Sequence, residues 1–156
     1  MKTAIIILSD PKSGSEEGLG RVFNALALAS ECKQKGDEVV VVFNGAGTRW
    51  PAELTKLSHP ANGLYNAVRD VVQGASCGCA EVFGATESVK ACGVPIVKDY
   101  ALSGTAGLLS LRRYMAEGWQ TIVFLVNSQG TVVRPSPVYG GSESKQEAQW
   151  PRSISI

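Results

Sequence analysis

The sequence has no long apolar run, no excess of charge of one sign and only one histidine. Its 156 residues include 15 Lys and Arg against 14 Asp and Glu, which gives a formal net charge of +1. A net charge so close to zero does not predict binding to nucleic acid or to an anionic membrane surface. The first apolar run stops at Leu8, short of the roughly 20 residues that cross a bilayer, and no signal-peptide cleavage pattern follows it. We therefore expect a cytoplasmic protein without nucleic-acid or membrane partners.

The glycine patterns of nucleotide-binding loops and the serine elbow of hydrolases are also missing. Gly14, Gly18 and Gly20 have neither the Rossmann nor the Walker spacing, and no Gly-x-Ser-x-Gly occurs. The pair Cys77-x-Cys79 is spaced more tightly than the usual zinc ligands, and a second ligand pair is lacking. The sequence therefore predicts no cofactor and no metal ion.

What the chain does contain is an alternation of apolar runs with amphipathic stretches. Strand-like runs occur at 3–8, 38–43, 73–78, 93–97 and 120–125, and helical periodicity occurs at about 16–35, 60–71, 79–91 and 105–117. Such alternation predicts βαβ units with right-handed crossovers. We predict a single α/β domain over 1–127, with three αβα layers and a mostly parallel five-stranded sheet. Residues 128–156, rich in Ser, Gly, Gln and Pro, are predicted to form a loosely ordered polar tail.

The helical periodicity also predicts which side chains face the core. It places Phe23 with Leu26 on the inward face of the first helix, and Val82 on the face that Cys79 shares in the third. In the fourth helix it places Met115 inward.

Two of the four cysteines stand where chemistry is expected. Cys77 and Cys79 lie between the end of a predicted strand and the start of a predicted helix, at the sheet edge where ligands bind in open parallel sheets. A helix start favours thiolate over thiol, which would make Cys79 a nucleophile. The alternative is that both are small apolar residues filling a tight turn. Cys32 and Cys92 have no activating neighbour and are predicted to be structural.

Four further residues are candidate ligand contacts. Asp10 follows the first strand at the same sheet edge, and Gly45 and Arg49 belong to the glycine-rich loop after the second strand. His59 is the only side chain with an ordinary pKa near neutrality. Each has a structural alternative, since Asp10 could cap the following helix and His59 could be a loop residue at the start of the next one.

Several stretches together resemble the DsrE-like family of small sulfur-relay and related proteins, over residues 3–126. They are EEGLGRVFNAL at 16–26, GDEV at 36–39, VFNGAGTRW at 42–50, HP at 59–60, CAEVFG at 79–84 and EGWQ at 117–120. The resemblance implies five parallel strands and homo-oligomers, commonly trimers or hexamers. In sulfur-relay members, a cysteine at this sheet edge accepts a sulfane sulfur from a donor protein and passes it to an acceptor protein. The position that matches this cysteine is Cys79.

Three functions remain open from the sequence. The first is a sulfur-relay protein, a possible sulfurtransferase, that carries a persulfide on Cys79 with Cys77 as a resolving thiol. The second is a non-catalytic oligomeric module that binds a small ligand in its sheet-edge crevice. The third is a thiol redox sensor based on Cys77 and Cys79.

Overall fold

The computed structural model describes residues 1–13 and 16–125, and in them the predicted α/β fold is confirmed. Five strands form one sheet in the order β4-β3-β2-β1-β5, and all neighbouring pairs are parallel. The strands are β1 (Lys2–Ile7), β2 (Glu38–Phe43), β3 (Val72–Ser76), β4 (Ile96–Val97) and β5 (Gln120–Phe124). Of these, β4 is shorter than the predicted 93–97 strand. The predicted tail at 128–156 lies outside the described residues.

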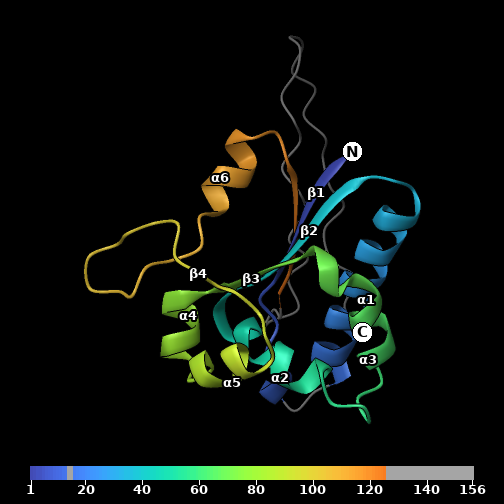
Figure 1. Ribbon diagram of the computed structural model, residues 1–156, viewed down its shortest axis with the longest axis horizontal. Helices are drawn as coiled ribbons and strands as arrows, with labels where there is room; N and C mark the ends of the chain where they lie inside the picture. Colours follow the sequence, from blue (N-terminus) through green and yellow to red (C-terminus); the bar gives the residue numbers. More distant parts are fainter. Residues whose placement is uncertain (14–15, 126–156) are drawn as a thin grey trace, which may run out of the picture.

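Within the described residues, six α-helices connect the strands, and they lie on both faces of the sheet as predicted. They are α1 (Glu16–Gln34), α2 (Trp50–Leu54), α3 (Asn62–Val68), α4 (Cys77–Val82), α5 (Thr86–Ala91) and α6 (Leu111–Ala116). Three short 3-10 helices, η1 (Pro11–Ser13), η2 (Gly45–Arg49) and η3 (Arg69–Val71), join them. Figure 1 shows α1 to α5 gathered on one side of the sheet and α6 on the other.

The two faces of the sheet are covered very differently. The face under α1 to α5 carries the larger core, in which Ile5, Ile7, Val41 and Phe43 pack against Val22 and many other buried apolar side chains. The opposite face carries a small core made of Ala4, Ile6, Val42, Leu109 and Tyr114. The second face is therefore covered by α6 and the segment that leads to it.

Three inward-facing predictions are wrong. Phe23 is 45% exposed, Val82 is 79% exposed and Met115 is 67% exposed. The last two errors follow from helix boundaries, because the predicted 79–91 helix is broken into α4 and α5 by Gly84, whose φ is +64°. The predicted 105–117 helix begins only at Leu111, so that Tyr114 faces the core instead of Met115.

The outer edge of the sheet is exposed. Along β5, Ile122 and Val123 are 37% and 43% exposed.

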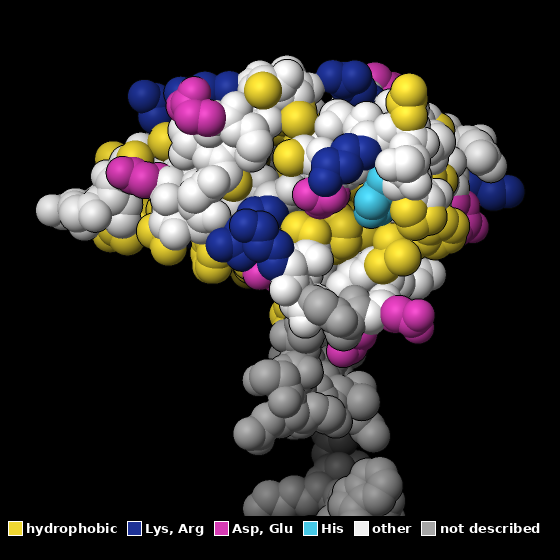
Figure 2. Space-filling model, turned by 90° about the horizontal axis from the view of Figure 1, so that it is seen from below, with side chains coloured by type: hydrophobic (Ala, Val, Ile, Leu, Met, Phe, Trp, Pro, Cys, Tyr) yellow, Lys and Arg dark blue, Asp and Glu magenta, His cyan; other side chains and the backbone are white. Residues whose placement is uncertain are grey.

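Lys and Arg side chains are interspersed with Asp and Glu on the face shown in Figure 2. No helix within residues 1–13 and 16–125 is both long enough and apolar enough to cross a bilayer.

Candidate functional site

The candidate site lies where β2 and β3 end. Asn44 follows β2 directly, and Cys77 and Cys79 open α4 directly after β3. Because the two strands are adjacent and parallel, their carboxyl ends bring residues separated by 35 positions into contact. The structure therefore has both cysteines at this sheet edge, as predicted, and Asn44 lies at the same edge.

In the part of the chain that the structure describes, the Cys79 sulfur has one polar side-chain contact, the amide of Asn44. Its Sγ lies 2.9 Å from Asn44 Oδ1, with the thiol donating. Asn44 is held in an extended conformation, and its backbone N–H donates to the Ile7 carbonyl at 2.9 Å. A side-chain amide carries both an acceptor and donors. By rotating, Asn44 can therefore accept from a thiol or donate to a thiolate.

The start of α4 is fixed by the segment that precedes α6. The Gly78 N–H donates to the Gly107 carbonyl at 2.7 Å, and the Ser76 hydroxyl accepts from the Leu109 N–H at 3.1 Å. A Cβ on Gly78 would lie 2.9 Å from Leu108 Cδ2, so glycine permits this close approach. The Gly78 N–H, one of the amides at the helix start, is thus occupied by a carbonyl. The polar group beside the sulfur is the Asn44 amide.

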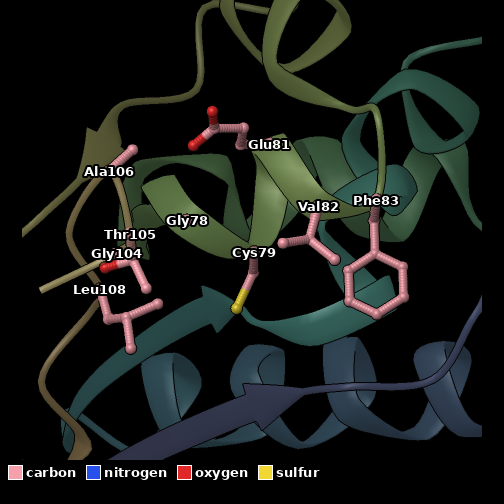
Figure 3. Close-up of a pocket in the computed structure, with 9 residues that line it drawn as sticks. All are labelled: Gly78, Cys79, Glu81, Val82, Phe83, Gly104, Thr105, Ala106 and Leu108. Carbon is pink, nitrogen blue, oxygen red and sulfur yellow. The ribbon is translucent and has the colours of Figure 1, made fainter. Parts of the chain in front are cut away.

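Two pockets meet at Cys79. The larger, about 730 Å³, has a mostly apolar lining made of Gly78, Cys79, Glu81, Val82, Phe83, Gly104, Thr105, Ala106 and Leu108. The smaller, about 500 Å³, is lined by Asn44, Cys79, Tyr100, Leu108, Leu109, Ser110, Leu111 and Arg112. Figure 3 shows the Cys79 side chain pointing out of α4 between Leu108 and Val82. The Cys79 residue is therefore half-buried and contributes to the lining of both pockets.

The other three cysteines lie outside these pockets. All four thiols are free, so Cys77 and Cys79 form no disulfide here. Cys77 is half-buried but lines neither pocket. Cys32 is buried in the larger core, and the Cys92 sulfur lies 3.5 Å from the Thr55 hydroxyl. Among these four thiols, Cys79 is the one that lines the two pockets described above and also has a polar side-chain partner.

Asp10 and Arg49, predicted as ligand contacts, bind each other. Arg49 Nη1 donates to Asp10 Oδ2 at 2.7 Å, and Arg49 Nε donates to the Phe83 carbonyl at 3.0 Å. The guanidinium also lies over the Phe83 ring, 5.3 Å from its centroid. Asp10 further accepts from the Lys12 N–H. These contacts connect the end of β1 to the turn between α4 and α5, which is a structural role.

Gly45 is likewise explained by packing. It has a φ of +53°, and a Cβ on it would lie 2.8 Å from Leu8 Cδ2. The neighbouring Gly47 is tighter still, with an ideal Cβ 2.1 Å from the Ile7 carbonyl oxygen. The glycine-rich loop therefore presses against the end of β1, and neither glycine lines the two pockets at Cys79.

His59 lies apart from the thiol. Its ring packs edge-to-face against Trp50 at 6.0 Å, and its Nδ1 accepts from the Ala61 N–H at 3.2 Å. Burial lowers the pKa of His59, more than the nearby Glu53 carboxylate raises it. His59 lines neither pocket at Cys79, so the structure brings no imidazole to the site.

Metal ligands do not gather in the described part of the chain. Within residues 1–13 and 16–125, no three side chains of His, Cys, Asp or Glu lie together as a metal site requires.

Sequence reasoning missed Asn44, Arg112 and the pocket wall at Thr105 to Leu108. Asn44 could have been found by taking the residue that follows each parallel strand, since these residues share one sheet edge. The wall could not, because it depends on how a long irregular segment folds back onto α4.

Comparison with known proteins gives one informative match. Over 124 residues the chain is 29% identical to an uncharacterized protein of Methanocaldococcus jannaschii. The aligned region covers 78% of this chain and 94% of that protein. No protein-family model matches the chain, and no solved structure matches it. The resemblance to DsrE-like proteins therefore stays a prediction.

Proposed function

We propose that this protein carries sulfur as a persulfide on Cys79. The observation that carries the proposal is the position of the Cys79 sulfur, which opens to two pockets and lies 2.9 Å from the Asn44 amide. A sulfur carrier needs a thiol that a donor can reach and a polar group that stabilises the charged forms. Cys79 has both, whereas Cys32 has neither.

The proposed transfer step is a thiol exchange. The Cys79 thiolate attacks the terminal sulfur of a donor persulfide, and a new S–S bond forms as the donor's S–S bond breaks. The donor thiolate leaves with the electron pair and takes up a proton, so no outside oxidant is needed. The Cys79 persulfide carries its negative charge on the added terminal sulfur, one bond beyond the Cys79 sulfur. The donor side of the Asn44 amide can stabilise both the attacking thiolate and the charged product.

The test is persulfide loading followed by intact and peptide mass spectrometry. After incubation with a cysteine desulfurase and cysteine, we expect a gain of one sulfur atom on the Cys79 peptide. Cys79→Ser should abolish the gain, and Cys77→Ser, the matched variant two residues away, should retain it. Loading confined to Cys32, or none while a control carrier is loaded, would refute the proposal. Loss of two hydrogens linking Cys77 to Cys79 would instead favour a redox sensor.

A second candidate function is suggested by the apolar lining of the larger pocket. Val82, Phe83, Ala106 and Leu108 line it, as expected for a site that binds a small apolar ligand without chemistry. A fluorescent apolar dye, anilinonaphthalene sulfonate, should then bind equally to the wild type and to a Cys77→Ala, Cys79→Ala double variant. Binding that requires the thiols would count against this second function.

The proposal includes the partners that a relay requires. Donor and acceptor proteins would dock at the opening beside Cys79, and we propose a cytoplasmic homo-oligomer, a trimer or hexamer, as the family resemblance implies. Light scattering on purified protein measures the subunit number directly. A monomer at micromolar concentration would contradict this part.

A further inference from the structure

We propose that the smaller pocket beside Cys79 selects sulfur compounds that carry a carboxylate, and that Arg112 is the selecting residue. This inference rests on the proposed function, because it names the class of small molecule that would exchange sulfur with Cys79. The pocket of about 500 Å³ lies within the size range of small-molecule sites.

Among the described residues that line the smaller pocket, one is charged, and it is a cation. Arg112 is exposed and is the second residue of α6. Within residues 1–13 and 16–125, no carboxylate forms an ion pair with Arg112. The adjacent Arg113 is different, since its Nη1 lies 3.2 Å from Asp99 Oδ2 and the two charges cancel. Among the described residues, the positive charge of Arg112 therefore has no ion-pair partner.

The larger pocket has the opposite sign. Glu81 is the one charged residue among the described residues that line it. Figure 3 shows the Glu81 carboxylate on the other side of α4 from the Cys79 sulfur. An anion approaching Cys79 through the smaller pocket would thus meet the Arg112 guanidinium without facing this carboxylate.

The remaining lining suits a small polar molecule. Tyr100 and Ser110 line the same pocket, and Leu108 lines both pockets. A molecule with a carboxylate at one end and a thiol or persulfide at the other could pair its carboxylate with Arg112 and present its sulfur to Cys79. Guanidinium groups bind carboxylates through two parallel hydrogen bonds, which orients the ligand as well as attracting it.

The experiment compares two alkylating agents that differ mainly in charge. Iodoacetate is anionic and iodoacetamide is neutral, and the ratio of their rates at Cys79 measures anion selection without any persulfide chemistry. Peptide mass spectrometry follows Cys79 alone. We expect Arg112→Gln to lower the iodoacetate-to-iodoacetamide ratio about three- to tenfold, and Arg112→Lys to restore part of it. The wild-type ratio should also fall as salt is raised, because salt screens exposed charges.

Lys98→Gln is the matched control. Lys98 is also an exposed cation in the segment between β4 and α6, but it lines a different hollow that does not include Cys79. Its removal should leave the ratio unchanged. A ratio that is unaffected by Arg112→Gln, or that falls equally with Lys98→Gln, would overturn the inference. If Cys79 is loaded with persulfide but Arg112→Gln leaves the iodoacetate-to-iodoacetamide ratio unchanged, only the anion selection is refuted. If loading fails but Arg112→Gln lowers the ratio, only the sulfur relay is refuted.

Discussion

Two polar pairs lie at the same edge of the sheet, and they behave differently. Asp10 and Arg49 form an ion pair at 2.7 Å in which both side chains are less than one-third exposed. Asn44 and Cys79 form a hydrogen bond at 2.9 Å, and both residues line the smaller pocket. The first pair uses its polar groups to hold elements together. The second leaves a reactive atom open to solvent.

A position at the carboxyl edge of a parallel sheet does not by itself make a residue functional. Arg49 donates to Asp10 and to the Phe83 carbonyl, so binding a ligand would first require breaking these bonds. Cys79 has one weak thiol hydrogen bond to lose. Substitutions at four positions test this distinction between a closed half of the edge, around Asp10 and Arg49, and an open half, around Asn44 and Cys79.

The largest effect is expected in the closed half, for Gly47→Ala. The new Cβ would lie 2.1 Å from the Ile7 carbonyl oxygen and 2.8 Å from its carbon. Since both are backbone atoms, β1 or η2 must shift, which should lower the free energy of unfolding by about 3 kcal/mol. Urea denaturation measures this. Gly20→Ala is the control, because Gly20 lies inside α1 with nothing within 4 Å of its Cβ, and it should stabilise by about 0.5–1 kcal/mol.

Arg49→Gln should have the next largest effect. It removes the ion pair with Asp10 and the hydrogen bond to the Phe83 carbonyl, and it leaves a partly buried carboxylate without its cation. We expect a loss of about 2 kcal/mol in the free energy of unfolding. Lys90→Gln, which breaks the exposed pair with Glu87, should cost less than about 0.5 kcal/mol. An intact stability with a strongly altered Cys79 alkylation rate would place Arg49 in the open half.

Asn44 tests the open half, where reactivity should change more than stability. We expect Asn44→Ala to slow iodoacetamide alkylation of Cys79 at neutral pH roughly tenfold, because a donor to the thiolate is lost. Asn44→Asp is the sharper variant. It keeps the shape and the acceptor but replaces the donor with a negative charge, so it should react more slowly than Asn44→Ala. If Asn44→Asp reacts as fast as the wild type, Asn44 acts only as an acceptor for the thiol.

Most of the fold could be predicted from the sequence because its signals are local. The continuous apolar runs at β1 and β2 and the periodicity of α1 depend on a few neighbouring residues. The helix boundaries around α4 and α6 were missed for a physical reason. Gly84 ends α4 through a left-handed conformation, and the residues before Leu111 form an antiparallel bridge between Tyr100 and Leu108 instead of a helical turn.

The site was only partly predictable. The sequence places Cys79 at the start of a helix after β3, and the structure agrees. The contact with Asn44 and the cation at Arg112 come from elements 35 and 33 residues away in the chain. Such contacts depend on strand order and on the path of the segment before α6, neither of which leaves a local pattern. Gly45 was predicted as a ligand contact because ligand binding and tight packing both select glycine, and in the structure it packs against Leu8.

The smallest effect is expected for His59. It packs against Trp50, the residue after Arg49, and so we count it with the closed half. Burial lowers its pKa in the folded protein, so the unfolded chain takes up a proton first as the pH falls through about 6.5. The unfolded state then binds more protons, and stability is lost as the pH falls from there toward the lowered folded pKa. His59→Gln should therefore lose less free energy of unfolding between neutral and mildly acidic pH than the wild type does. Because His59 packs against Trp50 and lines neither pocket, the pH profile of Cys79 alkylation should be the same in both proteins. If His59→Gln shifts the pH profile of Cys79 alkylation, the histidine influences the thiol, and the division of the edge into a closed and an open half is wrong.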